Sequence, residues 1–241
     1  MLWAIPFLLF VTVVLPLLAI SSYRSVHSAQ AVMPTRATLY VNLLILQLLM
    51  GSLAFFAAWG CRLVMPWSAR LEFATIGPAL GIVVGALVAA ISVSVFLDRS
   101  SGKTSNLAEM LYPKSLTDWL LWGTAMFAAG VIEEFAYRGV LFGLISQVSN
   151  SWWLAALLSA LVFGAGHATQ GWIGFIASGL FAIGMQWLVF HSEGLLLAIV
   201  AHMGYDVIVQ LLAPKFASKN NRQSAESKDV KLKAEVRDSD A

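Results

Sequence analysis

The sequence contains little charge and almost no cysteine. Asp, Glu, Lys and Arg make up 12% of the 241 residues, about half of the roughly 25% that is usual in soluble domains. This shortage argues against an ordinary soluble domain. The single cysteine, Cys61, excludes an internal disulfide and a cysteine-based metal cluster. The sequence has no basic stretch interleaved with aromatic residues, so it lacks the pattern typical of nucleic-acid binding.

Apolar residues are abundant instead, at 59% of the chain. Several apolar runs reach about 18 residues, the length that crosses a bilayer as a helix. The expected fold is therefore an all-α, polytopic membrane bundle of seven or eight transmembrane helices with a polar intramembrane cavity. The seven expected spans cover residues 2–20, 38–59, 74–97, 116–147, 152–167, 172–190 and 195–213. An eighth arises if the long fourth run divides, for which Gly123 and Gly130 are the expected places.

The chain divides into three regions by composition. Residues 1–115 hold the N-terminal helices and loops, residues 116–213 form a helical core, and residues 214–241 form a polar tail. Such a tail cannot bury enough apolar surface to fold alone, so we expect it to be disordered. The longest internal loop is expected at residues 98–118, and its end, Ser-Leu-Thr-Asp from Ser115, is typical of a helix start.

Two further patterns concern how the helices are arranged. Gly77, Gly81 and Gly85 repeat every four residues, which predicts a close-packing face for another helix. Such faces permit a homodimer without requiring one. The positive-inside rule predicts an outer N-terminus and a cytoplasmic C-terminal tail. The basic residues then placed on the cytoplasmic side are Arg24, Arg36, Arg99, Lys103, Lys114, Lys215, Lys219 and Arg222.

The fourth apolar run contains three charged residues within positions 131–140, which read V-I-E-E-F-A-Y-R-G-V. A charged side chain at the centre of a membrane costs about 2.5–3.5 kcal/mol on insertion scales, so these groups need partners or a function. Glu134 and Arg138 are four residues apart with the acid first, the spacing of a helical ion pair. Glu133 lies about 100° away from Glu134 round the helix, so it is not placed for the same ion pair and remains available for another role.

The later runs carry further polar residues. His167 ends the fifth run in F-G-A-G-H, four residues after Phe163, and His202 and Asp206 share one helix face in the seventh. Taken singly, each histidine is explained as a hydrogen-bonded packing residue, and Gln186 as a contact between helices. Because ionisable groups inside membranes face the bundle interior or a wet cavity, their presence on three helices favours a shared site.

These residue types suit hydrolysis. A carboxylate and an imidazole can hold and deprotonate a water molecule, and a second histidine can donate to a developing oxyanion. The alternative is a zinc site made of Glu133, His167 and His202. The sequence has no H-E-x-x-H motif. It also has no G-x-S-x-G elbow for a serine nucleophile. We therefore expect no cofactor, with zinc as the alternative.

Three motifs in order resemble those of the CPBP family of intramembrane proteases, also called the Abi or CAAX prenyl endopeptidase family. E-E-x-x-x-R begins at Glu133, F-x-x-x-H begins at Phe163, and H-x-x-x-[ND] begins at His202. The resemblance implies that Glu133 and His167 activate water. It also implies that Glu134 and Arg138 orient or stabilise their helix.

For the third motif, the resemblance implies an oxyanion site at His202 and Asp206. The eukaryotic prenyl endopeptidases have Asn at the last motif position, whereas this chain has Asp206. An ionised Asp only accepts hydrogen bonds, so here it would orient His202 or hold it protonated. Asp at this position resembles the bacterial branch of the family, whose members are not restricted to prenylated CAAX substrates.

The sequence thus predicts an intramembrane endopeptidase in a bacterial cytoplasmic membrane. Its partners would be the lipid bilayer and a membrane-anchored peptide or protein substrate, prenylated or otherwise hydrophobic, and no nucleic acid. One alternative is a non-catalytic membrane scaffold or a bacteriocin-immunity type of binding protein, and a second is a zinc-dependent form of the same protease. A proton-coupled transporter ranks last, because the sequence has no recognisable inverted repeats.

Overall fold

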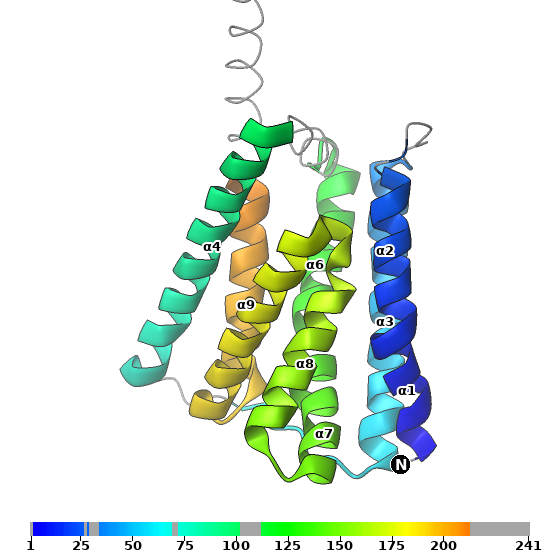
Figure 1. The fold of residues 1–241 in the computed structure, drawn as a ribbon, viewed down its shortest axis with the longest axis vertical. Helices are drawn as coiled ribbons and strands as arrows, with labels where there is room; N and C mark the ends of the chain where they lie inside the picture. Colours follow the sequence, from blue (N-terminus) through cyan, green and yellow to red (C-terminus); the bar gives the residue numbers. More distant parts are fainter. Residues whose placement is uncertain (1, 27, 29–33, 69–71, 102–111, 213–241) are drawn as a thin grey trace, which may run out of the picture.

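The computed structural model describes residues 2–26, 28, 34–68, 72–101 and 112–212. These residues form helices and no strands. Within them the chain makes seven helical segments that alternate in direction, so that consecutive segments run up and down the molecule (Figure 1). The expected all-α membrane bundle is confirmed.

The helices follow the apolar runs of the sequence. The first segment, Leu2–Val26, is continuous through η1, α1, η2 and α2. The bounds are η1 Leu2–Ala4, α1 Ile5–Leu9, η2 Phe10–Val14, α2 Leu15–Val26, α3 Arg36–Gly60, α4 Phe73–Ser101, α6 Leu116–Glu133, η3 Glu134–Leu141, α7 Phe142–Ser149, α8 Trp152–Gly166, η4 Ala168–Gln170 and α9 Gly171–Ser192. A last helix, Leu195–Leu212, follows α9.

Four of these segments are long and apolar enough to cross a membrane by length and composition: Leu2–Val26, Arg36–Gly60, Ala168–Ser192 and Leu195–Leu212. Shorter apolar helices are present at Phe73–Ala89 and Trp152–Gly166. Large apolar side chains such as Trp153 and Leu180 are exposed on the outside of the bundle, as is expected of a surface that faces lipid. The protein is an integral membrane protein.

Two details of the predicted helices were wrong. The predicted loop at residues 98–118 begins later, because α4 continues to Ser101. The fourth run does not divide at Gly123 or Gly130, since it is helical without interruption from α6 to α7. Its irregularity is the π-helix η3, which begins at Glu134. The predicted polar tail at residues 214–241 lies outside the described residues.

The small-residue face on α4 was also predicted wrongly. A Cβ atom built on Gly77, Gly81 or Gly85 would meet nothing within 4 Å in the described part of the chain. The helix packs instead through another face, on which Val83 is buried and Ile82 lies beside Gly184 of α9. The apolar pattern, rather than the glycine repeat, therefore decides which side of α4 meets the bundle.

Local signals fix where two helices of the core begin. Ser115 accepts a hydrogen bond from the backbone N–H of Asp118 at 3.1 Å, and Asp118 accepts one from the N–H of Ser115 at 3.2 Å. This capping box confirms the predicted start of α6. Ser151 caps α8 through its side-chain oxygen alone, which accepts a hydrogen bond from the N–H of Leu154. It follows directly after Asn150, which has the left-handed conformation that ends α7. The α7–α8 connection is therefore a tight hairpin.

The buried apolar side chains form two clusters. The first joins the N-terminal helices, α3, η3 and α8, with Phe7, Leu141 and Phe163 almost fully buried. The second joins α4, α9 and the last helix, with Leu188 and Leu195 fully buried. The buried apolar residues of η3 belong to the first cluster, and Leu195 of the second cluster lies beside Gly139 of η3.

We predict that Gly164→Ala lowers the melting temperature of the purified protein. A Cβ atom there would lie 2.6 Å from the backbone oxygen of Phe175 in α9, and overpacking of this kind costs about 1–3 kcal/mol. Gly123→Ala is the matched control, because a Cβ there meets nothing within 4 Å and Ala gains about 0.5–1 kcal/mol over Gly in a helix. Equal melting temperatures for the two variants would contradict the close approach of α8 and α9.

Candidate active site

The hairpin of α7 and α8 brings the first two motifs together. Both helices rise about 1.5 Å per residue, so residues at similar distances from the turn at 149–151 lie at the same height. Arg138 and Phe163 meet in this way, with the guanidinium carbon 4.3 Å from the centre of the ring. The ring of Tyr137 meets Phe163 edge to face, with the centroids 5.0 Å apart. The geometry therefore follows from the position of the turn.

Glu133 ends α6, and Glu134 and Arg138 lie in η3, whose eight residues are all buried. A π-helix has a wider turn than an α-helix, and such turns are frequent at functional sites. The hydroxyl of Ser159 in α8 donates a hydrogen bond to the backbone oxygen of Tyr137 at 2.8 Å. This bond satisfies a carbonyl of the irregular turn and ties η3 to α8.

Glu134 is fully buried at the centre of an ionic cluster. Its Oε1 atom lies 3.2 Å from Nη1 of Arg138, which is the ion pair that the spacing predicted. The same oxygen accepts a hydrogen bond of 2.7 Å from Nδ1 of His202. On the other side of the ring, Nε2 of His202 lies 3.7 Å from Oδ2 of Asp206. The first and third motifs are thus joined directly through Glu134.

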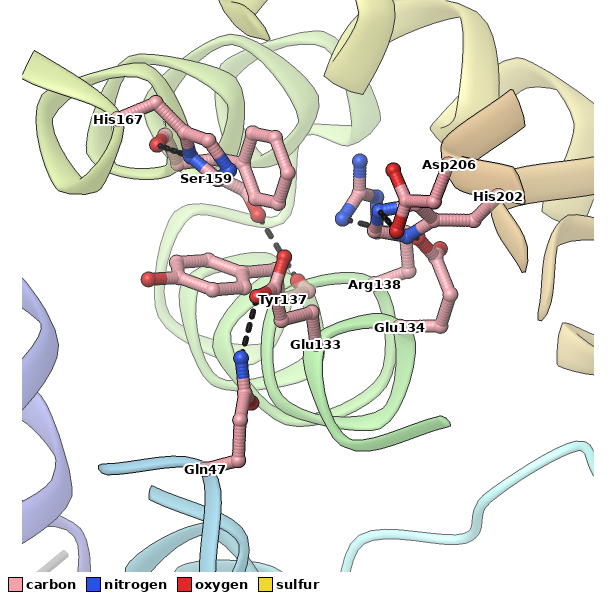
Figure 2. A network of polar contacts seen from close by, with 10 residues as sticks. Gln47, Glu133, Glu134, Tyr137, Arg138, Ser159, His167, His202 and Asp206 are labelled. Carbon is pink, nitrogen blue, oxygen red and sulfur yellow. Dashed lines mark hydrogen bonds and ion pairs between the residues drawn. The ribbon is translucent and has the colours of Figure 1, made fainter. Parts of the chain in front are cut away.

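Glu133 has different partners. Its Oε1 accepts a hydrogen bond of 2.5 Å from Nε2 of Gln47 in α3, while its Oε2 is buried without a hydrogen-bond partner among the described residues. Figure 2 shows Gln47 reaching Glu133 away from the cluster of Glu134, Arg138, His202 and Asp206. Adjacent carboxylates therefore occupy separate environments: Oε1 of Glu134 meets Arg138 and His202, whereas Oε1 of Glu133 meets only an amide. The Oε2 atom of each is buried without a hydrogen-bond partner among the described residues.

His167 follows the last residue of α8 and is half-buried. Its Nδ1 lies 2.9 Å from the backbone oxygen of Phe163, and because a carbonyl only accepts, Nδ1 carries the proton. In the neutral ring, Nε2 then keeps its lone pair and can accept a proton. The ring also packs on Phe163 with the centroids 4.3 Å apart, so Phe163 contacts both Arg138 and His167.

The comparisons with known proteins identify this part of the chain. Residues 115–208 match the family model "Type II CAAX prenyl endopeptidase Rce1-like". They form an Rce1-like domain. The match confirms the resemblance to the CPBP family, a family of intramembrane proteases. Searches of curated proteins and of solved structures found no match.

Two contacts of the Rce1-like domain were missed in the sequence. The bond between Gln47 and Glu133 comes from α3, outside the matched residues, and its only signal was a glutamine within an apolar span. The bond between Glu134 and His202 joins residues 68 apart, and no local pattern indicates it. Gln186 is buried in α9, which agrees with its interpretation as a residue between helices.

The proposed zinc ligands are not gathered into one cluster. In the described part of the chain, no group of three or more His, Cys, Asp or Glu side chains is placed to hold a metal ion. Nδ1 of His202 is bonded to Glu134, and its Nε2 faces Asp206. In this arrangement His202 does not present a nitrogen toward Glu133 and His167.

An apolar hollow of about 480 Å³ lies between the end of α2 and the start of α9, and Ala168, the residue after His167, forms part of its lining. It is lined by Ile20, Tyr23, Ala168, Gly171, Trp172 and Phe175. Its lining is almost entirely hydrocarbon and aromatic. The hollow therefore suits a hydrophobic chain more than a charged one.

We predict that Glu134→Gln strongly destabilises the protein. The variant leaves Arg138 and His202 facing a neutral amide, and breaking a buried ion pair from one side costs about 3–5 kcal/mol. Thermal unfolding in detergent is the measurement. Glu72→Gln, at an exposed carboxylate before α4, is the control and should change stability by less than about 0.5 kcal/mol. A melting temperature for Glu134→Gln equal to that of the control would contradict a structural role for this cluster.

Proposed function

We propose that this protein is an intramembrane endopeptidase that hydrolyses membrane-associated peptides or proteins with a water molecule activated by Glu133 and His167. The observation that supports this most directly is the unequal environment of the two adjacent carboxylates. Glu134 is held by Arg138 and His202, whereas Glu133 is held only by the neutral amide of Gln47. A carboxylate with no ion pair among the described residues and one unpaired oxygen is available to accept a proton from water, which suits Glu133 to the role of base.

The hydrolytic step uses these groups in order. The water oxygen attacks the carbonyl carbon of the peptide bond while one of its protons passes to Oε2 of Glu133, and Nε2 of His167 accepts the second hydrogen bond of the water. The tetrahedral intermediate then collapses, the C–N bond breaks, and the proton held by Glu133 passes to the leaving nitrogen. The second proton of the water leaves through Nε2 of His167 as the new acid ionises. The products are therefore a carboxylate, an amine and one proton, so atoms and charges balance.

His202 is the proposed donor to the oxyanion of the intermediate. Its Nδ1 is fixed by Glu134, and its Nε2 is 3.7 Å from Asp206, which is longer than a hydrogen bond. A ring protonated on both nitrogens therefore still has one N–H to offer. Asp206, as a carboxylate, balances the charge of that ring and limits its rotation.

The proposed substrate is hydrophobic and enters from the bilayer. The hollow lined by Ala168, Trp172 and Phe175 begins at the residue after His167 and can take an apolar segment or lipid chain. Prenylated peptides are one candidate class, suggested by the name of the family model. Peptides anchored by an apolar helix are another, and both classes belong in the first assays.

We predict that Glu133→Gln and His167→Gln each reduce cleavage about 100- to 10,000-fold, the range that general acid–base catalysis contributes. The measurement is the rate at which new termini form on membrane-anchored and prenylated peptides in proteoliposomes. His191→Gln is a matched control, because Nδ1 of His191 also contacts the backbone oxygen four residues before it, at 2.9 Å, but the side chain is exposed. Undiminished cleavage by both site variants would rule out Glu133 and His167 as the water-activating pair. Absence of cleavage of every peptide by the wild-type protein would favour a scaffold or immunity protein.

We also predict that cleavage survives removal of metal. In the proposed mechanism two protein side chains activate the water, so a strong chelator should leave the rate unchanged within about twofold, since this step needs no Lewis acid. Elemental analysis of the purified protein accompanies the assay. Stoichiometric zinc, together with activity that is lost on chelation and restored by zinc, would replace this mechanism with the zinc-dependent alternative.

A further inference from the structure

Gln47 is a buried polar side chain in the middle of α3, with 4% of its surface exposed. It lies in the N-terminal part of the chain, outside residues 115–208 that match the family model. The helix approaches α6 closely at this height, where Gly51 faces the side chain of Ile132. A residue of α3 is thereby brought next to Glu133, although 86 positions separate them in sequence.

The contact has a defined direction. An ionised carboxylate only accepts hydrogen bonds, so the amide of Gln47 must present its nitrogen to Glu133 and turn its oxygen away. The bond to Oε1 holds the carboxylate at one rotation and leaves Oε2 as its unpaired oxygen. A base needs such an arrangement, because its accepting oxygen must point at the proton that it removes.

Stability does not explain the choice of glutamine here. The amide oxygen of Gln47 is buried without a hydrogen-bond partner among the described residues, as is Oε2 of Glu133. Unpaired buried oxygens destabilise a fold, and α3 otherwise presents apolar side chains such as Met50 and Ala54 to the core. A polar residue with an unsatisfied atom beside a catalytic carboxylate is better explained by function.

We propose that Gln47 is a positioning residue of the hydrolytic site, which donates to Oε1 of Glu133 and thereby directs Oε2 at the attacking water. This inference rests on the proposed function, because it assigns Gln47 to the same reaction. It also means that the site is completed by α3 and not by the Rce1-like domain alone. Gln47 acts through Glu133 and does not touch the reacting atoms.

The test compares Gln47→Leu with Gln186→Leu, which removes another buried glutamine, on α9. We expect Gln47→Leu to lower kcat about 10- to 100-fold, the value of a hydrogen bond to a charged group. KM should stay within about twofold, since an interaction with the base acts on the transition state. Gln186→Leu should leave kcat unchanged. If Gln47 had only a structural role, Gln47→Leu and Gln186→Leu would change kcat by the same factor when they lower the melting temperature equally. Such a result would contradict the inference.

Gln47→Glu provides a conservative rescue. Its carboxyl can donate to Glu133 only when it is protonated, and two carboxylates this close share one proton. We therefore expect its rate, relative to that of the wild type, to rise as the pH falls. A ratio that is constant across the pH range would contradict the hydrogen bond and would point to packing alone.

A spectroscopic readout separates failure of this inference from failure of the proposed function. The carboxylate band of Glu133 is assigned in the infrared by difference against Glu133→Gln, and it should shift in Gln47→Leu but not in Gln186→Leu. An unshifted band overturns the inference whatever the activity, and so does a shifted band with an unchanged kcat. If Glu133→Gln cleaves as well as the wild type, the proposed function fails while the hydrogen bond remains testable by its band.

Discussion

The structure depends on a carboxylate that is buried with no access to solvent. Glu134 is stable inside the bundle because Arg138 and His202 meet the same oxygen from two helices. A charge in that position without partners would be expelled or neutralised, since its desolvation costs several kcal/mol. The ionic cluster therefore joins η3 to the last helix as well as balancing charge. The positions of the neighbouring residues in η3 and in the last helix depend on these contacts.

The neighbouring carboxylate, Glu133, lies outside this ionic cluster. Glu133 is the residue before Glu134, but its side chain points to α3, where the amide of Gln47 donates a hydrogen bond to Oε1. The π-helix begins at the next residue, so the chain changes its turn at the point where the two carboxylates separate. Phe163 completes the link, because its ring packs on His167 and on the guanidinium of Arg138. The ionic cluster is thus connected to both proposed water-activating groups: to His167 through Phe163, and to Glu133 through the backbone.

The sequence predicted most of the fold, because helix length and apolar content are local properties. Each of the seven predicted runs lies on a helix, and the Ser115 cap starts α6 as expected. The pair of Glu134 and Arg138 was equally accessible, since helix geometry alone sets their distance. The glycine repeat on α4 predicted a packing face that the described residues do not use, because small residues permit close packing without supplying a partner helix.

The parts of the site that could not be predicted depend on how distant helices pack. The bonds from Glu133 to Gln47 and from Glu134 to His202 span 86 and 68 residues, and nothing within one helix determines them. The π-helix was missed for a related reason, since its wide turn is stabilised by contacts such as the one from Ser159. Motif order drew attention to these residues, whereas the structure shows that Glu134 pairs with Arg138 and His202 and that Glu133 contacts Gln47.

The central claim is that Glu133 acts as a base toward water and not as a nucleophile. The most direct measurement is a single turnover in heavy-oxygen water, with enzyme in excess over a membrane-anchored peptide that the reconstituted protein cleaves. Mass spectrometry then locates the heavy oxygen. We expect it in the new carboxylate of the product and not in the protein fragment that contains Glu133. Heavy oxygen in the Glu133 carboxylate after one turnover would show a covalent intermediate and would contradict the account.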